Sequence, residues 1–333
     1  MKERIHIVLV TDKNFIAHLS VAICSVLKNT AQDAALSFYI LHEGLSEPAR
    51  NDIQNLQKIR SFDLQFVLID CSYYKKHLFT WGSGLPGVIF ARFKVPEMLR
   101  ELKKCIYLDT DIIVRADISE LWGVDISGHP FGAVEEPKDT RLRRNCGLSI
   151  PLDKAYCNTG VLLLNLEQLR AINIDDKVDE FLKTNKLELL YSEQDILNMM
   201  FYDRWLLLPM RWNVFTGMYT EMASNNYMHY SDEESLKALR DPAIVHFTGK
   251  EKPDSFLCLH PYAKEYWDYL KWTPLAGSVM LKDKSLRNFI IKFLSIIRIY
   301  LRRLPFIAWL RQVRCSLCVL SFMKLFRAAN IYH

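Results

Sequence analysis

The sequence predicts an α/β protein with a mainly parallel central sheet, helices on both of its faces and a basic helical tail at the C-terminus. Three observations lead to this prediction. Apolar strands alternate with amphipathic helices over residues 5–70, acidic side chains follow several strands, and the composition changes after about residue 276. Alternating strands and helices form parallel sheets through crossover connections. With 333 residues, half of them hydrophobic, and a net charge of +5, one large domain with an appendage is expected.

The first seventy residues predict a βαβαβ unit. The apolar, β-branched run IHIVLVTD indicates a buried strand, and the spacing of Leu19 and Ile23 in the next segment indicates a helix. Ser46 is the expected N-cap of a second helix, with Pro48 in its first turn. The expected elements, in order, are the strand 5–12, the helix 15–30, the strand 36–44, the helix 46–60 and the strand 62–70.

The middle of the chain continues this pattern less regularly. A glycine-rich turn after residue 83 precedes a helix that carries Arg92, and Ser192 is the expected N-cap of the helix that begins SEQDILN. The further expected elements are the strands 105–108, 112–114 and 129–136, the short helix 117–122, the strand and helix within 156–170, the helix 192–202 and the short strand within 242–254.

Two carboxylates, Asp109 and Asp111, interrupt an otherwise apolar run at the end of a predicted strand. Burying unpaired carboxylates is unfavourable. Ligands of parallel α/β sheets bind beyond the carboxyl ends of the strands, which is also where Thr11 and Asp12 are expected. Because residues two apart in a strand point to the same side, both aspartates can face one divalent cation, which would make the pair tolerable. Oxygen ligands suit magnesium or manganese, and an added imidazole favours manganese.

Six segments resemble, in order, the motifs of family 8 of the retaining glycosyltransferases, in particular the bacterial lipopolysaccharide glucosyl- and galactosyltransferases. The segments are VLVTDKNF, FARFKVPEML, CIYLDTDIIVRADISELW, CNTGVLLLNL, SEQDILN and HFTGKEKPD, which extend from residue 8 to about residue 254 and cover about three quarters of the chain. The resemblance implies a single GT-A type nucleotide-sugar-binding domain over residues 1–275. Residues 276–333 then form a separate basic amphipathic tail.

The resemblance also implies roles for individual residues. It implies a Mn2+ (or Mg2+) ion held by Asp109, Asp111 and His246. The implied contacts to the nucleotide part of a UDP-sugar are Thr11, Asp12, Asn14, Arg92, Asp109, Thr110, Asp111, Gly249 and Lys252. The implied catalytic residues at the donor sugar are Asn158, Gln194 and Asp195, with Gln194 beneath the anomeric carbon.

Each assignment has a simpler structural alternative, because the same residue types occur at ordinary strand and helix ends. The alternatives are a strand-end turn (Asp12, Asn14), an exposed helix charge (Arg92), a core histidine (His246), a solvated loop lysine (Lys252) and polar decoration of a helix N-terminus (Gln194, Asp195). An acidic pair such as that of Asp109 and Asp111 is likewise common in loops.

The chain departs from the family pattern in three places. Thr11 stands where many relatives have alanine, and Asp254 stands where some have an aromatic residue. Glu135 and Glu136 end the predicted acceptor-side strand in place of the shorter acid of one galactosyltransferase. The sequence therefore leaves open whether the donor is UDP-glucose or UDP-galactose.

The expected activity is retaining transfer of a hexose from a UDP-sugar to a hydroxyl of a lipid-linked saccharide acceptor, in the synthesis of lipopolysaccharide or another surface glycan. Retaining hydrolases use two carboxylates, one of them a nucleophile. Here the side chain implied beneath the sugar is the amide of Gln194, a poor nucleophile. We therefore favour a front-face route, in which a phosphate oxygen of the leaving UDP takes the acceptor proton, over nucleophilic attack by Asp195.

Three other classes of protein are compatible with parts of this pattern. A nucleotide-sugar pyrophosphorylase would require a glycine-rich phosphate loop after the first strand, which is absent. A glycogenin-like self-glucosylating protein would require an acceptor tyrosine near the site, and the fifteen tyrosines leave that open. A non-catalytic nucleotide-sugar-binding relative would be expected to lose the aspartate pair or HFTG, and both are intact.

The tail differs from the rest of the chain in its charge. Residues 281–333 contain eleven basic residues and one acidic residue. Apolar side chains and a cationic stripe recur at helical spacing over 286–304, and basic and aromatic residues alternate over 306–327. This pattern predicts helices that lie in an anionic membrane surface, and the apolar face favours lipid over nucleic acid. The alternative is that the helix packs on the domain or on another copy.

The N-terminus and the hydropathy of the chain predict its location. MKERIHIVLV lacks the apolar segment of a signal peptide, and no stretch is long and apolar enough to span a bilayer. Together with the basic tail, these features predict a cytoplasmic protein that is peripheral on the inner face of the cell membrane.

Overall fold

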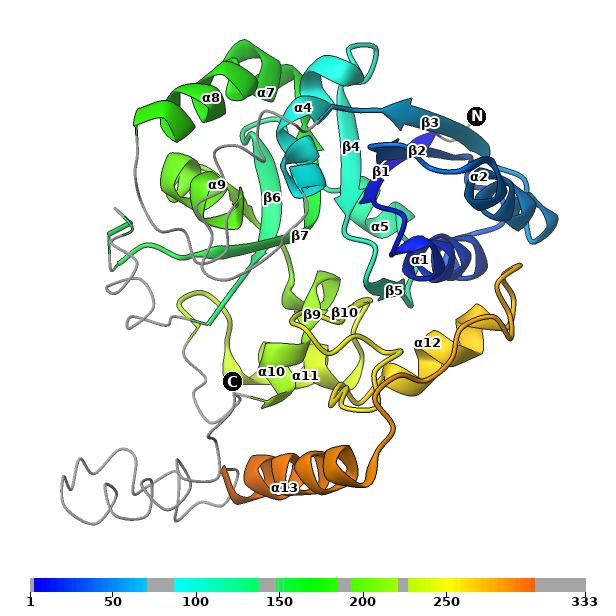
Figure 1. The fold of residues 1–333 in the computed structure, drawn as a ribbon. Coiled ribbons are helices and arrows are strands. Elements are labelled where there is room, and N and C mark those ends of the chain that lie inside the picture. Colours follow the sequence, from blue (N-terminus) through cyan, green and yellow to red (C-terminus); the bar gives the residue numbers. More distant parts are fainter. Residues whose placement is uncertain are drawn as a thin grey trace.

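The structure, a computed structural model, describes residues 3–70, 87–137, 148, 150–151, 153–184, 193–220 and 227–302. A seven-stranded sheet forms the centre of the molecule, and a three-stranded sheet lies below it (Figure 1). The strands of the large sheet, in spatial order, are β3 (Asp63–Leu68), β2 (Leu36–His42), β1 (Ile5–Thr11), β4 (Lys104–Leu108), β7 (Cys157–Asn165), β6 (Phe131–Glu135) and β8 (Leu206–Leu207). The strands of the small sheet are β5 (Ile112–Val114), β10 (Ile244–His246) and β9 (Val214–Phe215).

The large sheet is mainly parallel, as predicted. Strands β3, β2, β1 and β4 run in the same direction, with Ile5 of β1 opposite Leu36 of β2. Strand β7 is antiparallel to both of its neighbours, β4 and β6, whereas β6 and β8 are parallel. The N-terminal βαβαβ unit produces the parallel half, because a crossover helix returns the chain to the same edge before each new strand.

The helices cover both faces of the large sheet (Figure 1). The α-helices are α1 (Ile16–Asn29), α2 (Glu47–Gln54), α4 (Ala91–Met98), α5 (Ser119–Trp122), α7 (Leu166–Ala171), α8 (Ile174–Thr184), α9 (Glu193–Phe201), α10 (Thr216–Thr220), α11 (Asp232–Arg240), α12 (Ala263–Leu270) and α13 (Leu286–Arg302). Short 3-10 helices are η1 (Asn55–Lys58), η2 (Gly87–Phe90) and η3 (Met210–Trp212).

Strand β1 illustrates why its sequence is apolar throughout. Leu9 belongs to the core cluster that contains Ile23 of α1, whereas its neighbour Val8 belongs to a second cluster that contains Phe93 of α4. Successive residues of a strand point to opposite faces, so a sheet covered on both sides requires apolar residues at every position. The continuous apolar runs in the sequence are therefore explained by burial of both faces.

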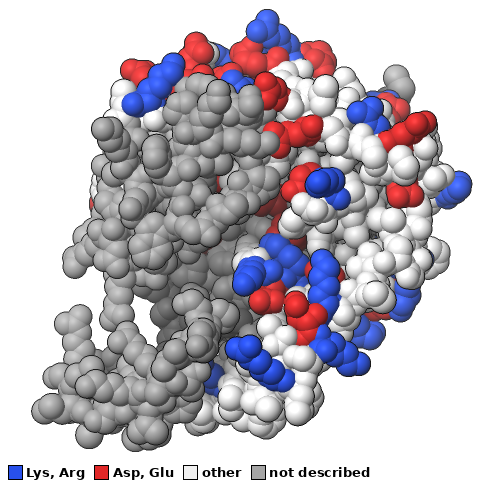
Figure 2. All heavy atoms as spheres, in the orientation of Figure 1, with Lys and Arg blue, Asp and Glu red and all other residues white. Residues whose placement is uncertain are grey.

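Most of the predicted elements are present, and the predicted cap at Ser46 is confirmed. The Ser46 hydroxyl accepts a hydrogen bond from the backbone N–H of Ala49 at 3.4 Å, and Pro48 lies in the first turn of α2. The predicted cap at Ser192 and the predicted segment 306–327 lie outside the described residues. Acidic and basic side chains are intermixed over the upper part of the face in Figure 2. None of the described helices has both the length and the apolar character that crossing a bilayer requires.

Candidate active site

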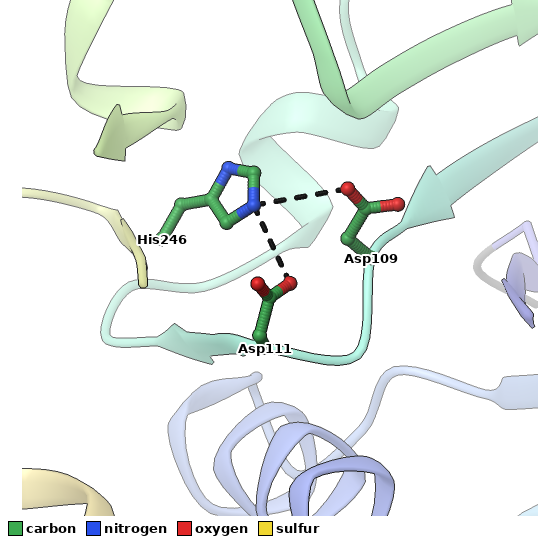
Figure 3. A group of neighbouring side chains, drawn as sticks. All are labelled: Asp109, Asp111 and His246. Atoms are coloured by element: carbon green, nitrogen blue, oxygen red, sulfur yellow. Dashed lines mark ion pairs between the residues drawn. The ribbon is translucent and has the colours of Figure 1, made fainter. Parts of the chain in front are cut away.

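Asp109, Asp111 and His246 come together where the two sheets meet. The aspartates lie on the turn that joins β4 to β5, and His246 is the last residue of β10. Nε2 of His246 lies 3.4 Å from Oδ1 of Asp111 and 3.7 Å from Oδ2 of Asp109 (Figure 3). Each of the three residues offers one potential ligand atom, and these atoms lie within 4.8 Å of one another.

The prediction that Asp109 and Asp111 face one side because they are two apart in a strand is wrong. Asp109 and Asp111 do not belong to one strand, because the chain leaves the large sheet at Leu108 and enters the small sheet at Ile112. The turn is fixed by antiparallel pairing of β5 with β10, in which Ile112 lies opposite His246. The backbone N–H of Phe247 also donates to the carbonyl oxygen of Asp111 at 2.9 Å. Tertiary pairing, and not the two-residue period of a strand, directs the carboxylates toward the imidazole.

A buried relay of amides orients the imidazole. The backbone N–H of Gly160 can only donate, so the Oδ1 of Asn158 faces it at 3.0 Å. The same Oδ1 accepts from Nδ2 of Asn213 at 2.7 Å, which leaves Oδ1 of Asn213 facing Nδ1 of His246 at 3.0 Å. Nδ1 of His246 therefore carries a hydrogen, and Nε2 is the ring nitrogen that faces the two aspartates. This is the arrangement that a second partner imposes on a metal-binding histidine.

Asp111 and Lys252 form an ion pair at the site. Burial alone would raise the pKa of Asp111, but Lys252 and then His246 outweigh it and hold the pKa well below its ordinary value. Lys252 Nζ contacts Oδ2 of Asp111 and donates to the carbonyl oxygen of Phe247 at 2.9 Å. Asp111 is thus an ionised carboxylate at neutral pH, and Lys252 is held at the site and is not a freely solvated lysine.

Arg92 is also part of the site and is not an exposed helix charge. Arg92 is 5% exposed, and its guanidinium lies 3.2 Å from carboxylate oxygens of both Asp109 and Glu193. NH1 donates to the carbonyl oxygen of Thr159 at 2.8 Å. Although burial would lower the pKa of Arg92, Tyr107, Glu193 and Asp109 raise it, so the side chain remains charged. A fixed cation therefore borders Asp109, as Lys252 borders Asp111.

The start of α9 faces the same region. Oε1 of Gln194 accepts from the backbone N–H of Thr159 at 3.1 Å, and Nε2 lies 3.2 Å from both Oε1 of Glu136 and the hydroxyl of Tyr156. Asp195 is fully buried and accepts from the Tyr156 hydroxyl at 2.6 Å. Both side chains bond to β7 and its flanks, so they do not merely decorate the helix end.

Residues after β1 and β10 form turns at the edge of the site. Oδ1 of Asp12 accepts from the backbone N–H of Asn14 at 2.7 Å, which is a strand-end turn, and Thr11 is buried. Gly249 has a φ of +88°, a conformation that favours glycine. Thr110 is buried between the two aspartates. Roles for these residues in nucleotide binding stay predictions.

Comparison with known proteins identifies the family. Residues 6–255 match the sequence profile of Glycosyl transferase family 8. The chain belongs to this family. It is 29% identical to "General stress protein A" of Bacillus subtilis over 81% of the chain and 94% of that protein. It is 23% identical to "Lipopolysaccharide 1,2-glucosyltransferase" of Escherichia coli K12 over 84% of the chain and 81% of that protein.

Solved family 8 structures share the fold. The chain superposes on galactosyltransferase LgtC, in complex with donor and acceptor sugar analogs, with a TM-score of 0.69 at 25% identity, over 86% of this chain and all of that one. It spans only a third to two thirds of several streptococcal glycosyltransferases. The family 8 fold and the classification as a glycosyltransferase are therefore established for this chain.

Three residues of this family 8 site were not singled out from the sequence. A Cβ on Gly160 would lie 2.1 Å from Cε1 of His246, so only glycine leaves room for the imidazole. Asn213 is fully buried and completes the relay, and Glu193 pairs with Arg92. Burial raises the pKa of Glu193 to about 7 even though Arg92 lowers it. A glycine inside a strand run signals close approach of another group, so Gly160 in CNTG could have been found, whereas nothing local marks Asn213.

Proposed function

We propose that this family 8 enzyme transfers a hexose, glucose or galactose, from a UDP-sugar to a saccharide hydroxyl with retention at the anomeric carbon. The observation that carries the proposal is the convergence of the Asp109, Asp111 and His246 group with the cations Arg92 and Lys252. Such a set suits a nucleoside diphosphate bound together with a divalent ion. The names of the relatives, a lipopolysaccharide glucosyltransferase and a galactosyltransferase with donor and acceptor sugar analogs, support hexosyl transfer.

The residues fit a Mn2+ or Mg2+ ion. Asp109 and Asp111 offer hard oxygen ligands, and the relay through Asn213 occupies Nδ1 of His246, so Nε2 is the nitrogen that would ligate an ion. These three side chains would hold the ion. When bound, it supplies positive charge that stabilises the departing diphosphate.

The chain's own side chains would bind and orient the substrates. Arg92 and Lys252, with the turn at Gly249, hold the diphosphate, while Asp12 and Asn14 after β1 hold the uridine. On the acceptor side, Oε1 of Glu136 accepts from Asn158 at 2.7 Å, and burial raises the pKa of Glu136. Asn158 and Glu136 are thereby placed to orient sugar hydroxyls.

The hydrogen bonds of Gln194 and Asp195 favour the front-face route. The Gln194 amide is neutral, and its Oε1 already accepts from Thr159. Asp195 is fully buried and bonded to Tyr156, which disfavours it as a nucleophile. In the front-face route the acceptor oxygen bonds to the anomeric carbon as the bond to the leaving UDP breaks. The acceptor proton passes to a phosphate oxygen of that UDP.

We also propose a lipid-linked acceptor and a peripheral position on the inner face of the cell membrane, with α13 on the anionic surface. Phe293 and Ile297 of α13 are 56% and 37% exposed. The helix carries basic and no acidic residues, and its region at the lower edge of Figure 2 contains blue atoms and no red ones. An apolar face beside a cationic one is the arrangement of interfacial helices.

The test is UDP release from UDP-glucose and UDP-galactose, with a saccharide acceptor and with or without Mn2+. We expect release that requires the metal, and we expect Asp111→Asn to lose most of it while retaining the unfolding transition, because the variant removes charge at the ion site. Asp203→Asn, which changes an exposed carboxylate, is the matched control and should behave as the unsubstituted protein.

Four results would redirect the proposal. Transfer only from a GDP- or CMP-sugar would refute the assigned nucleotide contacts, and full activity of Asp111→Asn in chelator would refute the metal site. A mass increase of the protein itself, by whole hexoses and without added acceptor, would indicate glycogenin-like self-glucosylation. Nucleotide-sugar binding without turnover on any acceptor would indicate a non-catalytic relative.

A further inference from the structure

The loop that carries Lys252 is held by a segment from much later in the chain. We call residues 279–285, which precede α13, the strap. Ser255 forms a parallel β-bridge with Lys282 of the strap. The backbone N–H of Lys282 donates to the carbonyl oxygen of Asp254 at 2.7 Å, and that of Phe256 donates to the carbonyl oxygen of Lys282 at 3.0 Å. The strap thus pairs with the loop through its backbone.

Asp254 is the charged centre of this contact. Its side chain is 8% exposed, and Oδ2 lies 2.6 Å from Nζ of Lys282. Oδ1 lies 3.6 Å from Nε2 of His18, a buried residue of α1. Burial lowers the pKa of His18, so this imidazole is neutral at pH 7 and Lys282 provides the positive charge in contact with Asp254. A buried carboxylate that loses its cation is strongly destabilised and must move toward water.

Asp254, which forms the ion pair with Lys282, lies close in sequence to Lys252, which belongs to the candidate active site. Asp254 follows Lys252 by two residues, and the carbonyl oxygen of Lys252 accepts from the backbone N–H of Ser255 at 2.8 Å. Lys252 pairs with Asp111. A displacement of Asp254 would therefore displace the turn from which Lys252 reaches Asp111.

The first turns of α13 hold the same loop. The rings of Phe256 and Phe289 are stacked with centroids 6.5 Å apart, and Nζ of Lys292 donates to the carbonyl oxygen of Phe256 at 2.7 Å. The strap and the beginning of α13 thus contact three consecutive loop residues, 254–256.

We propose that Asp254 and Lys282 are positioning residues, whose ion pair fixes the turn that presents Lys252 to Asp111 and to the diphosphate of the donor. The diphosphate part of this inference rests on the proposed function, whereas the effect on the loop does not. Asp254 is a position at which the chain departs from the family pattern. The strap is accordingly part of the support of the donor site in this chain, and not only a connection to α13.

The test compares Lys282→Met, which removes the charge and keeps the length, with Lys282→Arg and with Lys284→Met. Lys284 is an exposed lysine of the same strap and serves as the matched control. Hydrogen–deuterium exchange of the full-length protein without ligands reports on the amides of Ser255 and Phe256. We expect faster exchange in Lys282→Met, near-normal exchange in Lys282→Arg and no change in Lys284→Met.

Kinetics test the consequence for the donor. We expect Lys282→Met to raise KM for the UDP-sugar several-fold with a smaller change in kcat, because the Lys282 side chain is 66% exposed and solvent limits what its ion pair contributes. Lys282→Arg should restore most of the loss. Unchanged loop exchange in Lys282→Met, or faster exchange with an unaltered KM, would overturn the proposal. Absence of turnover in the unsubstituted protein would count against the proposed function alone, and the exchange comparison would still decide whether the ion pair holds the loop.

Discussion

At the scale of single residues, the site depends on hydrogen-bond partners that fix orientation. Asn213 faces Nδ1 of His246 and thereby determines that Nε2 is the ring nitrogen that faces Asp109 and Asp111. The determining group is the backbone N–H of Gly160, because it orients Asn158 and, through it, Asn213. Asn213, which lies outside the six motif segments, therefore decides which ring nitrogen of His246 faces the aspartates.

Asn213→Ala is expected to weaken Mn2+ binding by about 10- to 100-fold, which is the usual effect of removing the partner of a metal-binding histidine. Isothermal titration of the protein with Mn2+ measures this directly, without any assumption about the donor. Asn213→Asp retains an acceptor for Nδ1 and should bind the ion more tightly than Asn213→Ala. Equal affinities of the two variants and the unsubstituted protein would show that the relay has no influence on the ion.

His260 is expected to make the fold sensitive to acid. Burial lowers the pKa of His260 to about 3 from an ordinary 6.5. The unfolded chain therefore binds a proton between these pH values that the folded chain does not, so stability falls as the pH decreases below about 6.5. From pH 7.5 to pH 5 the expected loss from this residue is about 2 kcal/mol.

Urea unfolding at the two pH values measures that loss. In the unsubstituted protein, the backbone N–H of Tyr262 donates to Nδ1 of His260 at 3.2 Å. His260→Asn retains an acceptor for this N–H and should lose less stability between the two pH values than the unsubstituted protein. His129→Asn, at a partly exposed position, is the control. The same pH dependence in His260→Asn as in the unsubstituted protein would contradict the assignment.

At the scale of elements, β7 connects the core to the site. Its Leu162 and Leu164 belong to the core cluster with Phe93. At the beginning of the strand, Gly160 lies against His246 and Asp109, and Asn158 belongs to the amide relay. The same strand therefore requires apolar residues along one part and small or amide residues along the other. The segment CNTGVLLLNL follows this division.

Gly160→Ala is expected to abolish measurable Mn2+ binding, because the new Cβ would overlap the His246 ring and force it away from the aspartates. Gly132→Ala, on the adjacent strand β6, is the matched control. Its Cβ would meet the flexible end of Leu208 at 3.1 Å, so it should lower stability slightly and leave metal binding intact. Titration with Mn2+ and thermal unfolding of both variants decide the outcome, and normal Mn2+ affinity of Gly160→Ala would contradict the geometry.

At the scale of the whole molecule, α13 extends below the small sheet, away from the large one (Figure 1). Its contacts with the remainder of the described chain include Phe289 and Lys292, both directed at Phe256. Most of its apolar side chains are exposed, among them Phe293, Leu294 and Tyr300. Some packing on the domain and an exposed apolar face therefore coexist, so packing on the domain accounts for only part of the helix.

Phe293→Ser combined with Ile297→Ser is expected to reduce co-sedimentation with anionic vesicles several-fold, because it removes apolar area from the exposed face without changing charge. These positions avoid Phe289 and Lys292, so turnover of a soluble acceptor analogue should persist. Ser295→Gln, on the polar side of the helix, is the control. If the double variant sedimented with vesicles as well as the unsubstituted protein, the membrane role of α13 would be refuted.

The sequence by itself determined the fold class and the order of the elements, and its resemblance to family 8 implied the candidate metal ligands Asp109, Asp111 and His246. These features are local: the apolar runs, the cap at Ser46 and the motifs around Asp109 and His246 each depend on a few neighbouring residues. The resemblance of six ordered segments then specified the family, which the family comparison confirmed.

Only the tertiary structure decided how those residues act together. The aspartates face His246 because β5 pairs with β10, more than a hundred residues away, and not because they share a strand. Asn213 and Lys282 matter through contacts with Asn158 and Asp254 that no local pattern encodes. Propensity and periodicity report on neighbours along the chain, whereas hydrogen bonds and ion pairs between distant segments exist only once the core has packed.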